Sequence, residues 1–151
     1  DRLDDSIALI ATTNLFDAFD RALVRRFDAC VSFDRYSQDD LIEIAETITI
    51  ELLAKFKNVG RDMRLFKKIL SLSDCLPFPG DLKNIIKSAI AFSDPENEYD
   101  YLKRLYKQFA NSATIDIDIL KKQGFTIREM EKLTGISKST LSRQLNGGND
   151  E

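Results

Sequence analysis

The stretch IALIATTNLFDAFDRALVRRFD, residues 7–28, is the part of the chain from which the fold is best inferred. It opens with the uninterrupted apolar run 7–11, which is typical of a strand buried on both faces of a parallel sheet. Two threonines and Asn14 follow, at the end of the strand where open α/β sheets place ligand-contacting groups. A short helical segment then leads to the pair Arg25 and Arg26. This order predicts the edge of a ligand-binding α/β core.

The same order of features resembles the second half of the ATPase core of AAA+ proteins, especially the spastin and katanin branch. In that family the asparagine after the strand orients the attacking water, and paired arginines reach into the nucleotide site of a neighbouring protomer. The resemblance therefore implies catalytic roles for Asn14, Arg25 and Arg26. Phosphoryl transfer depends on positioning and charge neutralisation, and a guanidinium supplied in trans is worth roughly 10³- to 10⁵-fold in rate. Taken alone, the residues also fit a turn asparagine and solvated surface arginines.

The next segment contains the end of the predicted core and the start of a helical region. Residues 29–33 are rich in strand-favouring types and are expected to be the last strand of the core, which we assign to residues 1–34. Ser37 and Asp40 then match a capping box, which predicts the start of a long amphipathic helix. Apolar residues recur at helical spacing in four segments over residues 35–110. Four helices with short connections and one apolar face each predict a small bundle.

Two of these helices have recognisable start signals. The third is expected to open at Gly80 and Asp81, directly after Pro79. The fourth is expected to have Asp94 as its cap and Pro95 at its first helical position.

The place of this bundle is that of the helical lid in AAA+ proteins. There, a second sensor lies at the start of a lid helix, and the resemblance puts Gly80 and Asp81 at this nucleotide-binding position. Other branches have an arginine where this chain has Gly80, so sensing would fall to Asn14 and the arginine fingers. Gly80 would instead let the helix backbone approach the nucleotide closely. The alternative is a plain helix start after a proline turn.

A short segment connects the bundle to the end of the chain. Residues 110–114 are small and polar, which predicts a loop. Isoleucines that alternate with aspartates over residues 115–119 favour a strand, whereas Lys121 to Gly124 favours a helix with a glycine stop. We favour the short helix.

The stretch FTIREMEKLTGISKSTLSRQL, residues 125–145, has the pattern of a helix-turn-helix over residues 114–146. Thr126 is suited to cap a first helix, Gly135 permits a tight turn, and Ser137 is suited to cap a second helix. The apolar residues are spaced to form one shared core: Ile127, Met130, Leu133, Ile136, Leu141 and Leu145. The pattern resembles the helix-turn-helix of resolvases and many bacterial regulators, except that Glu131 stands where a small residue is usual.

In that motif the second helix enters the major groove of double-stranded DNA. If Leu141 faces the core, the residues available for DNA are Lys138, Ser139, Ser142 and Arg143, with Thr140 at the edge. Residues 121–146 carry six basic and two acidic side chains, a net charge of +4, although the whole chain is at −3. A local positive charge of this size is a modest footprint for phosphate contact. A protein-docking or purely structural hairpin is the alternative.

Composition excludes several kinds of chemistry. The chain has no histidine, which removes Ser-His and Cys-His nucleophiles and imidazole metal sites. None of the six glycines lies in a GxxxxGK[ST] phosphate loop, and no paired acidic residues follow an apolar run to hold Mg²⁺. Cys30 and Cys75 form no metal-binding pair, and we expect both to be small buried residues. No apolar run is long enough to span a membrane and no signal peptide is evident, which favours the cytoplasm.

The sequence therefore predicts a mainly α chain: the end of an α/β P-loop ATPase core, a four-helix AAA+ lid and a small helix-turn-helix, with residues 147–151 as a disordered tail. We expect a fragment of a longer ATPase that uses ATP and Mg²⁺, forms a homo-oligomeric ring, by resemblance a hexamer, and acts on DNA. The fragment alone should bind no nucleotide tightly and should not hydrolyse ATP. The alternatives are a non-hydrolysing DNA-binding transcriptional regulator and a protein-interaction module of an ATPase.

Overall fold

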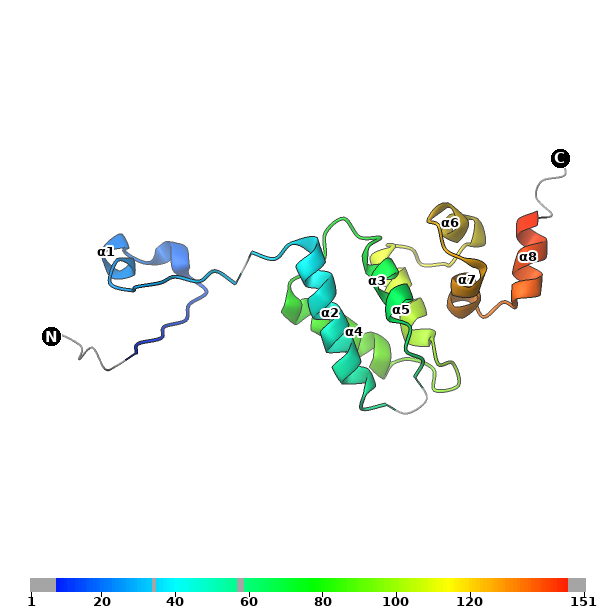
Figure 1. Ribbon diagram of the computed structural model, residues 1–151, viewed down its shortest axis with the longest axis horizontal. Coiled ribbons are helices and arrows are strands. Elements are labelled where there is room, and N and C mark those ends of the chain that lie inside the picture. The colour runs from blue at the N-terminus through cyan, green and yellow to red at the C-terminus, as the bar shows by residue number, and fades with distance from the viewer. Residues whose placement is uncertain (1–7, 34, 57–58, 147–151) are drawn as a thin grey trace. The chain divides into compact units, whose positions relative to one another are not determined.

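The computed structural model describes residues 8–33, 35–56 and 59–146, and it divides the chain into two units, Asp1–Arg35 and Tyr36–Glu151. Its described residues are mainly helical, which confirms the predicted mainly α class (Figure 1). Ile7, at the start of the first predicted strand, and the predicted tail 147–151 lie outside the described residues.

The first unit has little regular structure. Its helices are the 3₁₀ helix η1 (Phe16–Ala18) and the single turn α1 (Arg21–Val24). Asp20 caps α1 by accepting a hydrogen bond from the amide of Ala22, at 2.9 Å. None of the described residues of this unit is buried.

The two predicted strands do not form among the described residues. Residues 8–11 and 29–33 carry no regular secondary structure, and both segments are exposed. A strand must pair its backbone amides and carbonyls with a neighbour, and the described part of the chain offers no partner strand. The α/β core end is therefore not confirmed. Cys30 shares this exposure, so the prediction that it is buried was wrong.

The second unit begins with a bundle of four helices. Their bounds are α2 (Gln38–Leu53), α3 (Met63–Leu70), α4 (Pro79–Ala91) and α5 (Asp100–Phe109). Helix α2 packs on α3 and α4, while α5 packs on α3 and α4. The capping box at Ser37 and Asp40 forms as predicted, with the two reciprocal backbone bonds at 3.1 and 2.8 Å.

The core of the bundle comes from the apolar faces of all four helices. Fully enclosed side chains include Phe66 and Leu65 from α3, Leu82 from α4 and Tyr101 from α5. The hydroxyl of Tyr101 donates to the carbonyl of Gly60 at 2.9 Å, which satisfies the one polar atom that this ring buries. Burial of this kind stabilises the unit by about 25 cal/mol for each Å² of apolar surface removed from water.

Helix α5 begins later than the sequence predicts. Asp94 does not cap it: its carboxylate accepts from the amide of Glu96 at 2.9 Å and forms a local turn instead. The carboxylate of Asp100 accepts from the amide of Asp94 at 3.0 Å and from Arg104 at 2.7 Å. Because these bonds hold residues 94–99 in turns, the helix starts only at Asp100. Cys75, in the loop between α3 and α4, is exposed rather than buried as predicted.

Three short helices complete the second unit: α6 (Ile117–Lys122), α7 (Ile127–Thr134) and α8 (Lys138–Asn146). The short helix predicted before Gly124 is thus confirmed. Helix α7 packs on α5 and α8, and α6 packs on α8. In the described part of the chain, no helix has both the length and the apolar character needed to cross a membrane.

Candidate nucleic-acid interface

The first helix of the candidate interface, α7, is fixed at both ends by local interactions. Its capping box pairs the amide of Thr126 with the Glu129 carboxylate at 2.7 Å, and the amide of Glu129 with the Thr126 hydroxyl at 3.3 Å. Gly135 ends the helix with a φ of 75°, and its amide donates to the carbonyl of Glu131 at 2.8 Å. This left-handed conformation favours glycine because any side chain there would be strained.

The second helix, α8, starts with a cluster of hydroxyl groups. The Ser137 hydroxyl lies 3.0 Å from those of Ser139 and Thr140, and it accepts from the amide of Thr140 at 3.4 Å. Leu141 is completely buried and fixes which side of α8 faces inward.

The inward and outward faces can now be compared with the predicted ones. Met130 and Leu133 are buried with Leu141, as predicted, but Ile127 is 37% exposed because it lies in the first turn of α7, outside this shared core. Of the predicted DNA-contacting residues, Lys138, Ser139, Thr140 and Arg143 are exposed and Ser142 is half-buried.

Glu131 has a role that its unusual position in the motif did not reveal. Its carboxylate accepts a hydrogen bond from the amide of Lys138 at 3.3 Å and lies 3.4 Å from the Lys138 ammonium. The side chain therefore reaches across the turn to the first residue of α8. A negative charge at this place is favourable because a helix N-terminus carries a partial positive charge.

The basic residues of residues 121–146 fall into two groups. In the first group, Lys132 forms an ion pair with Asp62, Lys138 forms one with Glu131, and Lys121 donates to the carbonyl of Leu145 at 3.5 Å. Within the described residues, no ion pair or side-chain hydrogen bond is formed by the second group, which consists of Lys122, Arg128 and Arg143. This second group carries the charge that is fully available to a nucleic acid.

The hairpin, which consists of α7, the turn 135–137 and α8, is attached to the bundle by two ion pairs. The Lys132 ammonium lies 2.6 Å from the Asp62 carboxylate, and the Lys68 ammonium lies 2.8 Å from that of Glu129. The four side chains are all less than one-third exposed. Each lysine also lies over an aromatic ring, which adds a cation–π contact: Lys68 over Phe125 at 4.5 Å and Lys132 over Tyr99 at 4.6 Å.

These pairs shift the pKa values of their members. Burial raises the pKa of Asp62, but hydrogen bonds from Lys132 and from the amide of Leu65 outweigh it, and the pKa lies below its ordinary value. Glu129 behaves likewise, with bonds from Lys68 and Thr126 that outweigh burial, so its pKa is also lowered. The hydrogen bond to Asp62 raises the pKa of Lys132. All three groups are therefore charged at neutral pH.

The residues predicted to contact nucleotide lie in both units. Asn14, Arg25 and Arg26 are exposed in the first unit, where Arg25 follows the last residue of α1. Gly80 and Asp81 are exposed in the first turn of α4 in the second unit. Apart from its chain neighbours and the nearby backbone of α4, no described heavy atom lies within 4 Å of the place where a Gly80 side chain would begin, so the surrounding fold does not require glycine there.

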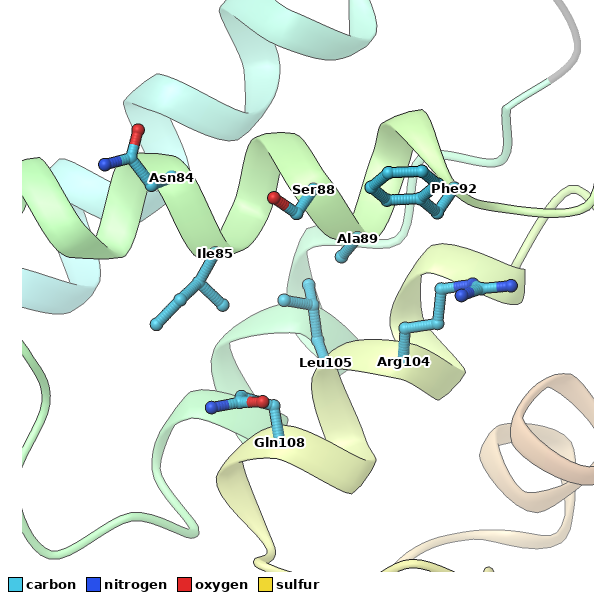
Figure 2. Close-up of a pocket in the computed structure, with 8 residues that line it drawn as sticks. All are labelled: Asn84, Ile85, Ser88, Ala89, Phe92, Arg104, Leu105 and Gln108. Atoms are coloured by element: carbon cyan, nitrogen blue, oxygen red, sulfur yellow. The ribbon is translucent and has the colours of Figure 1, made fainter.

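A groove of about 370 Å³ lies between α4 and α5, but it includes none of the predicted residues. Figure 2 shows Ile85 and Leu105 pointing into it from the two helices, with polar side chains at its rims. Phe92, at its end, is 73% exposed. Among the described residues, no group of three or more acidic or cysteine side chains could hold a metal ion.

Sequence reasoning missed the bundle–hairpin contacts and the role of Glu131. The capping box at Thr126 and Glu129 matches a known local pattern and could have been found. The partners of Lys132 and Lys68 lie 70 and 61 residues away, and no local pattern indicates such pairs.

Comparisons with protein-family models, with curated proteins and with solved structures find no match for this chain.

Proposed function

We propose that the chain is the C-terminal part of an AAA+ ATPase whose terminal helix-turn-helix binds double-stranded DNA. The DNA-binding part of this proposal rests on one observation, the geometry of α8. Leu141 is buried while Lys138, Ser139 and Arg143 are exposed, which supports a helix whose outward face could enter the major groove. Arginine and lysine side chains suit guanine edges and phosphates, and the hydroxyls of Ser139, Thr140 and Ser142 suit either.

The charge distribution supports weak, salt-sensitive binding by a single chain. Lys122, Arg128 and Arg143 have no charged partner among the described residues, so about three phosphates can be neutralised without breaking an ion pair. Three such contacts give a slope near −3 in a plot of log affinity against log salt. Useful affinity then comes from several copies in a ring that engage one DNA molecule.

The test is fluorescence anisotropy with duplex DNA at several salt concentrations. We expect Arg143→Ala to weaken binding by about 1–3 kcal/mol, because among the described residues this side chain has no ion-pair or hydrogen-bond partner that competes with DNA. Lys138→Ala should have a smaller effect, since its ammonium is already shared with Glu131.

Lys83→Ala is the matched control, because it removes one exposed charge from α4, outside the hairpin. It should bind DNA like the parent chain. If Arg143→Ala and Lys138→Ala also bind like the parent, the hairpin is a protein-docking or structural element and the DNA proposal is wrong.

The ATPase half of the proposal rests on the resemblance of residues 7–28 and on the surface of the first unit. Ile10, Val31 and Phe33 are 72 to 86% exposed, although their types are among those most often buried. This exposure supports segments that pack within a larger α/β core. Asn14, Arg25 and Arg26 would then act on nucleotide and Mg²⁺ held by other parts of a homo-oligomeric ring, with Gly80 and Asp81 at the lid position.

Turnover measurements on the ATPase that contains this chain distinguish the three functions considered. The proposed enzyme should hydrolyse ATP faster when duplex DNA is present. A non-hydrolysing DNA-binding regulator would show no turnover in either condition. An ATPase whose hairpin docks a protein would show turnover that is indifferent to DNA.

A further inference from the structure

The two ion pairs between hairpin and bundle follow a defined order along the helices. On α3, the acidic partner is Asp62 at the N-terminal cap and the basic partner is Lys68, nearly two turns later. On α7, the acidic partner Glu129 comes first and the basic partner Lys132 lies three residues later, on the same side of the helix. Since Asp62 meets Lys132 and Lys68 meets Glu129, the pairs run in opposite directions along the two helices.

This order favours one way of docking and opposes its reverse. If the hairpin were turned end to end, Asp62 would face Glu129 and Lys68 would face Lys132. Two like-charged pairs would then replace two opposite-charged ones, and both would be partly shielded from water. Such like-charge contacts are a standard means by which proteins exclude a wrong orientation.

Contacts besides the two ion pairs hold the same face in place. Phe125 is 5% exposed and meets the ring of Tyr106 from α5 edge to face, with ring centres 5.9 Å apart. The Tyr106 hydroxyl donates to the Gln123 side chain at 2.9 Å, and the Lys68 ammonium donates to the carbonyl of Gly124 at 2.7 Å. These contacts fix the segment before α7 to the bundle, in addition to α7 itself.

We propose that α7 is a coupling helix, which holds the hairpin on the bundle in one orientation so that the DNA-facing side of α8 moves with the bundle as one rigid body. Where the bundle is the lid of an ATPase, as proposed above, a nucleotide-dependent movement of the lid reorients α8. By linkage, DNA that prefers one orientation then changes nucleotide affinity by the same factor.

The rigid-body part can be tested on the 151-residue chain without nucleotide or DNA. Cys30 and Cys75 are replaced by serine, and spin labels are attached to cysteines introduced at Lys87 on α4 and Gln144 on α8. Both positions are exposed. Pulsed electron paramagnetic resonance measures the distribution of distances between the labels, and one narrow distribution is expected.

Lys132→Glu places a like charge against Asp62, and it should broaden the distribution or add a second distance. Adding Asp62→Asn should restore a narrow distribution, because asparagine removes the repulsion and still caps α3. Lys83→Glu makes the same charge change at an exposed position on α4, outside the contact and outside the proposed DNA-binding residues, and should leave the distribution narrow. Circular dichroism identifies any variant that has lost helix, and Lys132→Gln then replaces Lys132→Glu.

A broad distribution in the parent chain, or an unchanged one in folded Lys132→Glu or its replacement, would contradict the coupling helix. Anisotropy with duplex DNA on the same variants keeps the two proposals separate. If no variant binds DNA while the distances behave as expected, DNA binding fails and the coupling helix stands.

The regulatory consequence is tested in the ATPase that contains the chain. DNA affinity should differ by roughly 5-fold or more between ATP-analogue and ADP states. The ratio should fall toward one in Lys132→Glu and remain in Lys83→Glu. If the parent binds DNA with the same affinity in both nucleotide states, coupling to nucleotide is wrong.

Discussion

The two units of the chain contain similar apolar residues, but these are exposed in the first unit and buried in the second. In the first unit, Ile10 is 86% exposed and Val31 is 75% exposed, whereas Leu65 and Phe66 in the bundle are completely enclosed. The difference lies in what each segment needs as a partner. A helix of the bundle has one apolar face that neighbouring helices cover, but an uninterrupted apolar run needs cover on both faces and strands on either side. Composition alone therefore does not tell which unit can fold on its own contacts.

The largest expected effect is a loss of ATP turnover when an arginine of the first unit is replaced in an assembled ATPase. Arg25→Ala and Arg26→Ala should each lower ATP turnover by roughly 10³- to 10⁵-fold while nucleotide binding stays close to that of the parent. The reason is that a cation supplied to a neighbour acts on the transition state rather than on bound ATP. The measurement is steady-state turnover together with calorimetric nucleotide affinity.

A mixing experiment provides the control for that prediction. An arginine variant mixed with a protein defective in its phosphate loop should recover part of the turnover, because each supplies what the other lacks. Absence of recovery despite proven co-assembly would argue against action in trans.

The next largest effect is a difference in stability between variants at a buried and at an exposed apolar position of the isolated chain. Phe66→Ala should lower the free energy of unfolding by about 3–5 kcal/mol, because it leaves a cavity in the bundle. Ile10→Ala should change it by less than about 0.5 kcal/mol, since the side chain is already in water. Urea unfolding followed by circular dichroism measures both. A comparable loss in Ile10→Ala would mean that the first unit does have a core, and the contrast drawn here would be wrong.

A pair of glycines tests how tightly the second unit is packed around two positions of its backbone. A side chain at Gly60 would overlap the ring of Tyr99, with its first carbon 2.7 Å from Cζ. Gly60→Ala should therefore cost about 1–3 kcal/mol, as overpacking does. Gly80→Ala should be neutral or stabilise by up to about 1 kcal/mol, because it lies in open space and alanine favours helix. Equal thermal stabilities of the two variants would contradict this packing difference.

The smallest expected effect is a dependence of the stability of the second unit on pH. The lowered pKa values of Asp62 and Glu129 stabilise the fold above their ordinary values of 3.8 and 4.5. That contribution is lost as pH falls from about 4.5 through the lowered pKa values of the two groups, because the carboxylates then take up protons. Lys132→Gln should remove up to about 1 kcal/mol of stability at pH 7 and flatten the acid limb of the curve. Urea unfolding between pH 7 and pH 2 would show it, and an unchanged acid limb would contradict it.

Local patterns were sufficient for much of the second unit. The capping box of Ser37 with Asp40 and the turn at Gly135 each depend on residues within about one helical turn, and both are as predicted. The inward position of Leu141 follows from the spacing of apolar residues within the hairpin, and it is as predicted too. The start of α5 was predicted wrongly from Asp94, because Asp-Pro starts a turn as readily as a helix. The Asp94 amide is bonded to the carboxylate of Asp100, six residues later, and this bond stabilises the turn.

The candidate site was predicted less completely, for two physical reasons. Counting charges from 121 to 146 treats Lys132 as available to DNA, whereas folding brings it to Asp62, 70 residues away. Arg25 and Arg26 are exposed in a unit whose described residues include none that is buried, so packing within that unit does not fix where their side chains lie. Sequence patterns thus identify the kinds of residue at a site better than they identify their partners.

Glu131 gives the hairpin a feature that bears on how it exchanges ligands. Its carboxylate oxygens contact the amide and the ammonium of Lys138, two groups that a DNA phosphate would also seek. The carboxylate thus mimics a phosphate within the free protein. Binding of DNA at this point would substitute one anion for another, and the displaced carboxylate would then stand near the negatively charged backbone. If the hairpin binds DNA as proposed, a phosphate at Lys138 would add little net stabilisation because it would only replace the Glu131 carboxylate. Discrimination at this end of α8 would then come from contacts to the bases.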